Sequence, residues 1–367
     1  MNSTIPPVFS SWIRLQRFTH TYELAISKRR TQTLHVHYSS APTQKQIAEH
    51  LGVSQALVSR ALSGRAAEIG ASSETVDKIC RMAAEWNYQP SATALALLGA
   101  PTRTIGVVVK NFDDPFFGGL IGALQTLARK DKHSLLLTGP GREDLFGLQR
   151  HRVDAVIFAG SDFPPEEPVH FKQVIQIGTG RVFSSAMQIQ MDEPAGVEEM
   201  VDYLVGLGHR EIGFVGREVK ATQRRAAQLR KTLQARGLSI REKSFIPFVG
   251  SDGDAAETAV EKLLGLTPMP TAVLAAEDSI ALALLRVLHE AGLRVPQDIS
   301  IAGIDDISAS SQAIPPLTTL QQPIFEMAAA AFRAISDHRQ QVVSIPGKLM
   351  IRKSCAPPLP RSKIPSI

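Results

Sequence analysis

The sequence contains little of several residue types, and each shortage excludes a class of protein. Only 2 of its 367 residues are cysteine, and Cys80 and Cys355 lie in unrelated contexts, so no cysteine metal cluster is expected. No run approaches the roughly 18 apolar residues that cross a bilayer. Arg14 and Arg17 fall where a signal peptide needs its apolar centre. These absences predict a cytoplasmic protein with no metal, no cofactor and no membrane partner.

Positive charge is concentrated near the N-terminus. With 44% hydrophobic and 20% charged residues the chain is globular, and its length predicts two or three domains. Residues 1–103 hold 11 Lys or Arg and 6 Asp or Glu, while the remainder holds 29 of each kind. This asymmetry fits a polyanion-binding head on a neutral body, although a basic tail without a partner explains the charge equally well.

Residues 1–42 show no periodic pattern, and two interpretations stay open for them. They form either a tail without regular structure, in which Lys28, Arg29 and Arg30 are solvated or help to hold phosphate, or a translated upstream segment with the true start near Val36. We base no function on this extension.

A compact helical pattern follows over residues 43–88. Thr43 can cap a helix over "QKQIAEHL", Gly52 interrupts, and a third helix begins after Ser72–Ser73. Ala48, Gly52 and Val58 stand at i, i+4 and i+10, the spacing of a helix-turn-helix, although a structural three-helix bundle has the same composition. The residues expected in the core are Ile47, Ala48, Leu51, Leu57, Val58, Ala61, Leu62, Val76, Ile79, Cys80 and Ala83.

The outward face of the second helix would then carry short polar groups and one arginine: Ser54, Gln55, Ala56, Ser59, Arg60 and Ser63. Arg60 can donate to the O6 and N7 of guanine, and Gln55 can pair with adenine. Thr43, Ser54 and Ser63 suit phosphates, which fix register and not sequence. This face predicts a DNA-reading helix.

From Thr104 onward, short apolar segments alternate with helical stretches. They are "TIGVVV", "HSLLLTG", "VDAVIFAG", "QVIQIGTG", "EIGFVG", "TAVLAAE" and "ISIAGID". Such alternation predicts an α/β fold of doubly wound parallel sheets, which bind ligands beyond the carboxyl ends of their strands. The loops "KNFDDPFF", "AAEDS" and "GIDDIS" are therefore the expected binding segments.

These motifs together resemble the lactose-repressor (LacI/GalR) family of bacterial transcription regulators, over roughly 85% of the chain. "TQKQIAEHLGVSQALVSRALSG", "TIGVVVKNFDDPFF", "LGHREIGFVG", "EAGLRVPQDISIAGIDDI" and "PPLTTLQQP" occur in family order. The resemblance implies an all-α helix-turn-helix head over residues 43–88, a hinge over 89–103 and a two-lobed, periplasmic-binding-protein-like body over 104–367. The lobes are expected at 104–190 with 323–338, and at 191–322 with 342–355.

The resemblance also implies partners. A homodimer or tetramer would bind a pseudo-palindromic double-stranded DNA operator, with Leu97 in the hinge wedged into the minor groove. An alternative is that Leu97 and its neighbours are core residues.

A small-molecule effector, a sugar or a related polyol or amino-sugar, would bind between the lobes. The family's effector contacts transfer to Asp114, Phe116, Phe117, Glu198, Arg225, Asp278 and Asp305, each of which has a capping or solvated role as its alternative. Glu193, Glu198 and Glu277 replace residues that the family usually has there, and this acidic cleft disfavours anionic effectors.

Two other functions are considered. A solute-binding protein without DNA function would need a secretion signal in place of the basic helical head. An enzyme would need a nucleophile and a base at a matching spacing. The sequence offers no such spacing around its histidines, which include His151, His170, His209 and His289. The sequence therefore favours an operator-binding repressor with an effector-controlled affinity.

Overall fold

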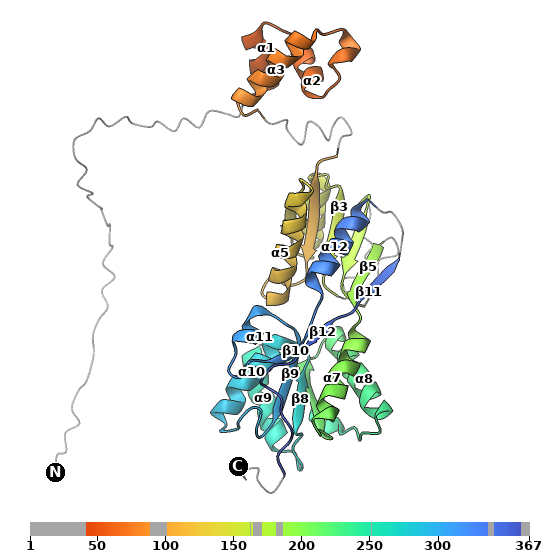
Figure 1. The fold of residues 1–367 in the computed structure, drawn as a ribbon, viewed down its shortest axis with the longest axis vertical. Coiled ribbons are helices and arrows are strands. Elements are labelled where there is room, and N and C mark those ends of the chain that lie inside the picture. The colour runs from red at the N-terminus through yellow and green to blue at the C-terminus, as the bar shows by residue number, and fades with distance from the viewer. Residues whose placement is uncertain are drawn as a thin grey trace, which may run out of the picture. The chain divides into compact units, whose positions relative to one another are not determined.

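The computed structural model describes residues 42–88, 101–161, 163, 171–180, 186–250, 252–336 and 341–360. The chain divides into two compact units, Met1–Gln89 and Pro90–Ile367. We call residues 42–88 the head and residues 101–360 the body (Figure 1). Residues 1–41 of the expected extension (1–42) and residues 89–100 of the expected hinge (89–103) lie outside the described residues.

The head consists of α1 (Gln44–Leu51), α2 (Gln55–Leu62), the 3-10 helix η1 (Ala66–Ile69) and α3 (Ser73–Glu85). Side-chain hydroxyls of Thr43, Ser54 and Ser72 accept a backbone N–H at the three α-helical N-termini. Gly52 ends α1 at φ 66°, a left-handed conformation that glycine adopts without a Cβ penalty. Local chemistry thus fixes both sides of the turn between α1 and α2.

The core of the head joins all three helices. Ile47 of α1, Val58 of α2 and Ile79 of α3 are fully buried in one cluster. Each such side chain contributes about 1.5–3 kcal/mol by burial. The prediction that Cys80 lies in this core is wrong, because Cys80 is exposed. One residue turns a helix by about 100°, so a neighbour of the inward-facing Ile79 points away.

The first sheet of the body has the strand order β11-β5-β4-β3-β1-β2, and every pairing is parallel. Its strands are β1 (Thr104–Val109), β2 (Ser134–Thr138), β3 (Ala155–Ala159), β4 (Val174–Ile177), β5 (Ala186–Met191) and β11 (Val342–Ile345). Helices α5 (Pro115–Lys130) and α12 (Ile324–Ile335) share one core cluster with β1, while α6 (Arg142–Arg150) contributes to the cluster on the other face. This is the first lobe.

The second sheet has the order β12-β10-β9-β8-β6-β7, parallel except at β12. Its strands are β6 (Ile212–Arg217), β7 (Phe245–Phe248), β8 (Ala272–Ala275), β9 (Ser300–Asp305), β10 (Thr318–Gln321) and β12 (Lys348–Met350). Its helices are α7 (Glu193–Gly206), α8 (Lys220–Ala235), η2 (Glu242–Ser244), α9 (Asp252–Leu264), α10 (Asp278–Glu290) and α11 (Ser308–Gln312). Figure 1 shows α7 and α8 on one face of this second lobe and α9 and α10 on the other.

The chain passes between the lobes three times, after β5, after β10 and after β11. One predicted boundary is wrong here: residues 342–345 were expected in the second lobe, but β11 pairs with β5 in the first sheet. The true crossing falls between Ile345 and Lys348, where β12 joins β10 in the second sheet. In each lobe, one of the two edge strands, β11 or β12, therefore comes from the C-terminal part of the chain.

Candidate functional site

The first candidate site is the exposed face of α2 in the head. Gln55, Ala56 and Arg60 are exposed, and Ser59 is half-buried. Among the described residues, no protein group bonds the Gln55 amide or the Arg60 guanidinium. The core residue Val58 faces the opposite way, fully buried. The exposed face of α2 thus presents the N–H donors of Arg60 and Gln55, while the opposite face of the helix packs into the core of the head.

Three hydroxyls expected at phosphates have local roles in the head. The Thr43 hydroxyl accepts the Gln46 N–H at 3.3 Å, and the Ser54 hydroxyl accepts the Leu57 N–H at 3.2 Å. The Ser63 hydroxyl donates to the Arg60 carbonyl at 3.1 Å. All three side chains are exposed, so a phosphate contact stays compatible with these caps. Leu97 lies outside the described residues.

The second candidate site is a cavity of about 680 Å³ in the body. It lies beyond the carboxyl ends of strands from both sheets, the position that doubly wound folds use for ligands. The lining residues are Lys110, Asn111, Asp114, Phe116, Phe117, Gly160, Ser161, Ile177, Gly178, Thr179, Met191, Glu193, Arg217, Glu218, Val219, Lys220, Ala221, Gln223, Arg225, Glu277, Asp305, Gln322 and Met327. We call this cavity the interlobe pocket.

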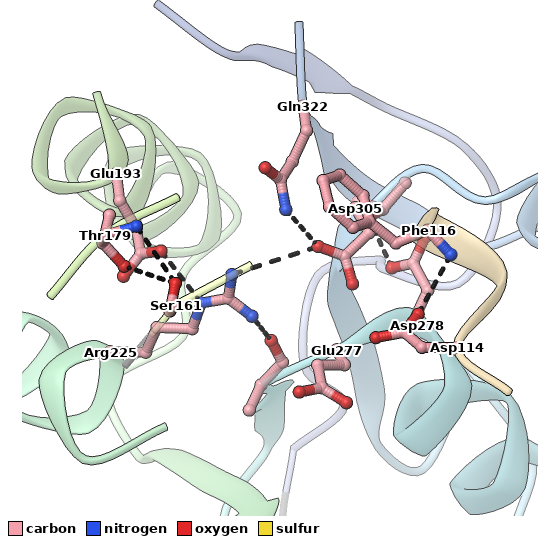
Figure 2. A network of polar contacts seen from close by, with 12 residues as sticks. Asp114, Phe116, Ser161, Thr179, Glu193, Arg225, Glu277, Asp278, Asp305 and Gln322 are labelled. Carbon is pink, nitrogen blue, oxygen red and sulfur yellow. Dashed lines mark hydrogen bonds and ion pairs between the residues drawn. The ribbon is translucent and has the colours of Figure 1, made fainter. Parts of the chain in front are cut away.

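Arg225 of α8 is the centre of the polar network in this pocket (Figure 2). Its Nε donates to Glu193 Oε2 at 3.0 Å, and its side chain also donates to the Ala276 carbonyl at 2.5 Å. Its third nitrogen lies 4.0 Å from Asp305 Oδ1. Burial alone would lower the pKa of the guanidinium, but the charges of Glu193, Asp305 and Glu277 outweigh it and raise that pKa. Arg225 is permanently charged and already bound by the protein.

Asp305 ends β9 and holds an unusual backbone conformation at φ 123°. Its Oδ1 accepts a hydrogen bond of 2.6 Å from the Gln322 amide, which follows β10. Burial raises the pKa of Asp305 well above its ordinary value, against the opposing effect of Arg225. The end of β9 is thus tied to the second crossing between the lobes.

Asp114 and two phenylalanines supply the first-lobe wall of the pocket. Asp114 caps α5, accepting the Phe116 N–H at 2.9 Å, and burial raises the pKa of its carboxyl. Phe116 and Phe117 meet edge to face with ring centroids 5.2 Å apart. The structure therefore brings Asp114, Phe116 and Phe117 together with Arg225 and Asp305 around one cavity, and their contact with an effector stays a prediction.

Asp278 is not a lining residue, contrary to the prediction. Its carboxylate is fully buried and accepts hydrogen bonds from Thr319 Oγ1 at 2.5 Å, Ser310 Oγ at 2.6 Å and the Ile307 N–H at 3.1 Å. A Cβ at Gly303 would collide with Asp278 Oδ1, so glycine is required for this close approach. Asp278 ties the start of α10 to β9, β10 and α11.

Glu198 is also absent from the lining set. It lies within α7, where its Oε1 is 3.5 Å from the Gln228 amide of α8. Glu198 is more than one helical turn beyond the crossing after β5, so its side chain faces the neighbouring helix and not the cavity.

The sequence pattern did not single out several lining residues: Ser161, Thr179, Arg217 and Gln322. Each stands at the end of a strand or within two residues of it, so the position of the strand ends could have identified them. Thr179 is notable because its hydroxyl accepts a hydrogen bond of 3.1 Å from Arg224 of α8. This bond links the first lobe directly to the second.

One of the histidines considered for catalysis, His209, has structural contacts. His209 is fully buried, its Nδ1 is 2.9 Å from the Thr271 hydroxyl, and burial lowers its pKa to about 4. No cluster of three His, Cys, Asp or Glu suited to a metal occurs in the part of the chain that the structure describes. None of the helices in that part has the length and apolar character that crossing a bilayer requires.

Comparison with known proteins finds relatives over most of the chain. A family model for a periplasmic binding protein-like domain matches residues 201–355. The ribose operon repressor of Haemophilus influenzae is 27% identical over 304 residues, covering 80% of this chain and 90% of the relative.

Two solved structures share the fold. The lac repressor dimer bound to operator and the anti-inducer ONPF matches with a TM-score of 0.73 and 24% identity, over 86% of this chain and 99% of that chain. A LacI family transcriptional regulator from Enterococcus faecium with bound ribose matches with a TM-score of 0.62 and 26% identity, over 69% of this chain and 99% of that chain. The helix-turn-helix head, the two-lobed body and these similarities agree: over most of its length the chain is similar to transcriptional repressors and regulators of the LacI family.

Proposed function

We propose that this protein is a sequence-specific DNA-binding transcriptional repressor whose operator affinity is set by a small-molecule effector in the interlobe pocket. The observation that carries the proposal is the exposed face of α2, with the Arg60 guanidinium and the Gln55 amide free of protein partners among the described residues. A solute-binding protein without DNA function would have no use for such a face. The similarity to a ribose operon repressor supports the same function.

The assembly we propose is a homodimer on a pseudo-palindromic operator in the cytoplasm. Two α2 helices related by a two-fold axis would read two half-sites one turn of DNA apart. Thr43, Ser54, Ser59 and Ser63 would position the head on phosphates, and Leu97 would enter the minor groove at the hinge.

The pocket supports control by a ligand because its lining comes from both lobes. Asp114 and Phe116 belong to the first lobe, and Arg225 and Asp305 to the second. A ligand that contacts both walls binds one lobe arrangement more tightly than another, and so shifts the population of arrangements. A coupling free energy of about 1–3 kcal/mol would change operator affinity by roughly 5- to 150-fold.

Base readout by Arg60 is tested by Arg60→Ala. We expect the preference for a palindrome from the upstream region over a scrambled duplex to fall by about 1–3 kcal/mol, because alanine cannot form the bidentate pair with guanine. Fluorescence anisotropy with both duplexes at one salt concentration measures the preference.

Lys78→Ala is the matched control, since Lys78 lies on α3 in an exposed ion pair with Glu74 at 2.8 Å. It removes the same unit of charge, so it should weaken binding to both duplexes alike. An unchanged preference in Arg60→Ala would refute sequence-specific repression through α2.

A further inference from the structure

The interior of the interlobe pocket contains more carboxylates than cations. Its buried or half-buried lining acids are Asp114, Glu193, Glu277 and Asp305, whereas the buried or half-buried lining cations are Arg217 and Arg225. The other charged lining residues, Lys110, Glu218 and Lys220, are exposed. The interior therefore carries an excess of negative charge when its carboxylates are ionised.

Both interior guanidiniums are already engaged by the protein. Arg225 is bonded to Glu193 and to the Ala276 carbonyl. Arg217 lies 2.9 Å from Asp252 Oδ1 and 3.4 Å from Glu277 Oε2. An anionic ligand would have to displace these internal carboxylates before it could use either arginine.

The carboxylates, by contrast, retain unused acceptor atoms. Asp114 uses Oδ1 for the Phe116 N–H, and Glu277 uses Oε2 for Arg217. Within the described ranges, no protein donor reaches Asp114 Oδ2 or Glu277 Oε1. Burial raises the pKa of Glu277, with Arg225 and Arg217 opposing it and Asp114 and Asp252 adding to it. The two acids repel each other, and a cation between them would remove that cost.

The rest of the lining suits a hydroxylated ring. Phe116 and Phe117 offer aromatic surface to an apolar ring face, and Ser161 and Thr179 offer hydroxyls. The Ser161 and Thr179 hydroxyls are 3.2 Å apart on the first lobe, while Glu193 and Arg225 lie on the second (Figure 2).

We propose that the effector is a polyhydroxy compound that carries a protonated amine, with the ammonium group bound by Glu277 and Asp114. The proposal rests on the proposed function and adds the chemical class of its ligand. Neutral sugars would leave Asp114 Oδ2 and Glu277 Oε1 without a cationic partner, and sugar phosphates would meet the excess of negative charge.

Matched pairs of ligands test the amine directly. Isothermal titration of the full chain at neutral pH compares glucosamine with glucose, galactosamine with galactose, and tris(hydroxymethyl)aminomethane with its neutral counterpart pentaerythritol. We expect the amine of at least one pair to bind about tenfold more tightly than its hydroxyl partner. Equal affinities within every pair, or no binding by any of these compounds, would overturn the proposal.

Glu277→Gln tests whether the Glu277 carboxylate binds the ammonium group. This variant keeps the shape of the side chain and should reduce the ratio of amine to hydroxyl affinity to about 1. Glu257→Gln, at an exposed residue of α9, should leave that ratio unchanged. Melting curves show whether the pocket tolerates the neutral amide, and Asp114→Asn repeats the test from the other lobe. Retention of the full preference in both pocket variants would overturn the assignment.

Operator binding by the same samples separates the two proposals. Should a neutral sugar alter operator affinity while no amine is preferred, the regulatory function stands and the amine is wrong. Should the preferred amine leave operator affinity unchanged, its role as effector is wrong. Should the chain lack any operator preference, the proposed function itself fails.

Discussion

Arg225 is the more buried of the two interior cations of the interlobe pocket. It is nine-tenths buried and is surrounded by Glu193, Glu277 and Asp305. Buried carboxylates are costly unless a cation compensates them, and here one guanidinium serves several. Arg225 thus has a structural role of its own, besides any contact with an effector.

Replacement of this arginine is expected to destabilise the body strongly. Arg225→Met should lower the free energy of unfolding by about 3 kcal/mol at neutral pH, because the removal of one partner leaves buried carboxylates unpaired. Urea unfolding followed by circular dichroism measures the loss.

The control is Arg286→Met on α10, where the arginine is half exposed and pairs with Glu290 at 2.8 Å. An exposed pair contributes at most about 1 kcal/mol, so this variant should remain close to the parent. Similar losses in both variants would contradict the role given to Arg225.

The sequence could identify pocket residues by their position but not by their direction. Asp114 and Asp305 follow strands, and the topology carries them to the cavity. Asp278 also follows a strand closely, yet it turns back over Gly303 into the interior. The direction of the Asp278 side chain depends on the rotation of α10 about its axis and on the space that Gly303 leaves above β9. Neither can be read from the sequence pattern.

At the scale of elements, the turn between α1 and α2 is fixed by local chemistry. Gly52 has φ 66°, and a Cβ added there would meet nothing within 4 Å. Any effect of substitution at Gly52 therefore comes from the backbone conformation and not from crowding.

Gly52→Ala is expected to destabilise the head by about 1 kcal/mol, since alanine is strained at positive φ. Both tryptophans, Trp12 and Trp86, precede residue 89, so tryptophan fluorescence follows this unit during urea unfolding.

Gly118→Ala in α5 is the counterpart, because that glycine is helical and also has nothing within 4 Å. Alanine should stabilise the body by about 0.5–1 kcal/mol there, as judged by circular dichroism. If Gly52→Ala were as stable as the parent, the turn would not depend on its left-handed residue.

Most strands that the sequence predicted have continuous burial, and the exception is β2, whose residues at the sheet edge are exposed or half-buried. Strands such as β1 and β3 show apolar runs because both their faces are covered. Other strands lack that signal: β7 contains Pro247, β10 is "TTLQ", and β11 is partly exposed at the sheet edge. Long-range pairing, and not local pattern, makes these segments strands, and for the same reason the sequence placed β11 in the wrong lobe.

At the scale of the whole molecule, the excess positive charge is not in the folded head. Residues 42–88 contain five Lys or Arg and five Asp or Glu, whereas residues 1–41 contain five basic residues and one acidic residue. In the proposed function the head would therefore read bases without a net charge of its own. Attraction to the phosphate backbone must come from local placement of Arg60 and its neighbours, or from the preceding segment.

Removal of residues 1–41 separates these two sources. If the segment binds phosphates, the shortened chain should bind the operator and a scrambled duplex more weakly by the same factor, because phosphates carry no sequence information. The slope of log affinity against log salt should fall by about 0.9 for each phosphate that the segment neutralises. Arg60→Ala should do the opposite, changing the ratio between the duplexes more than the common affinity. If the salt slope did not change after the deletion, the attraction to the phosphate backbone would come from the head alone. Because the head has no net charge, the source would then be the local placement of Arg60 and its neighbours.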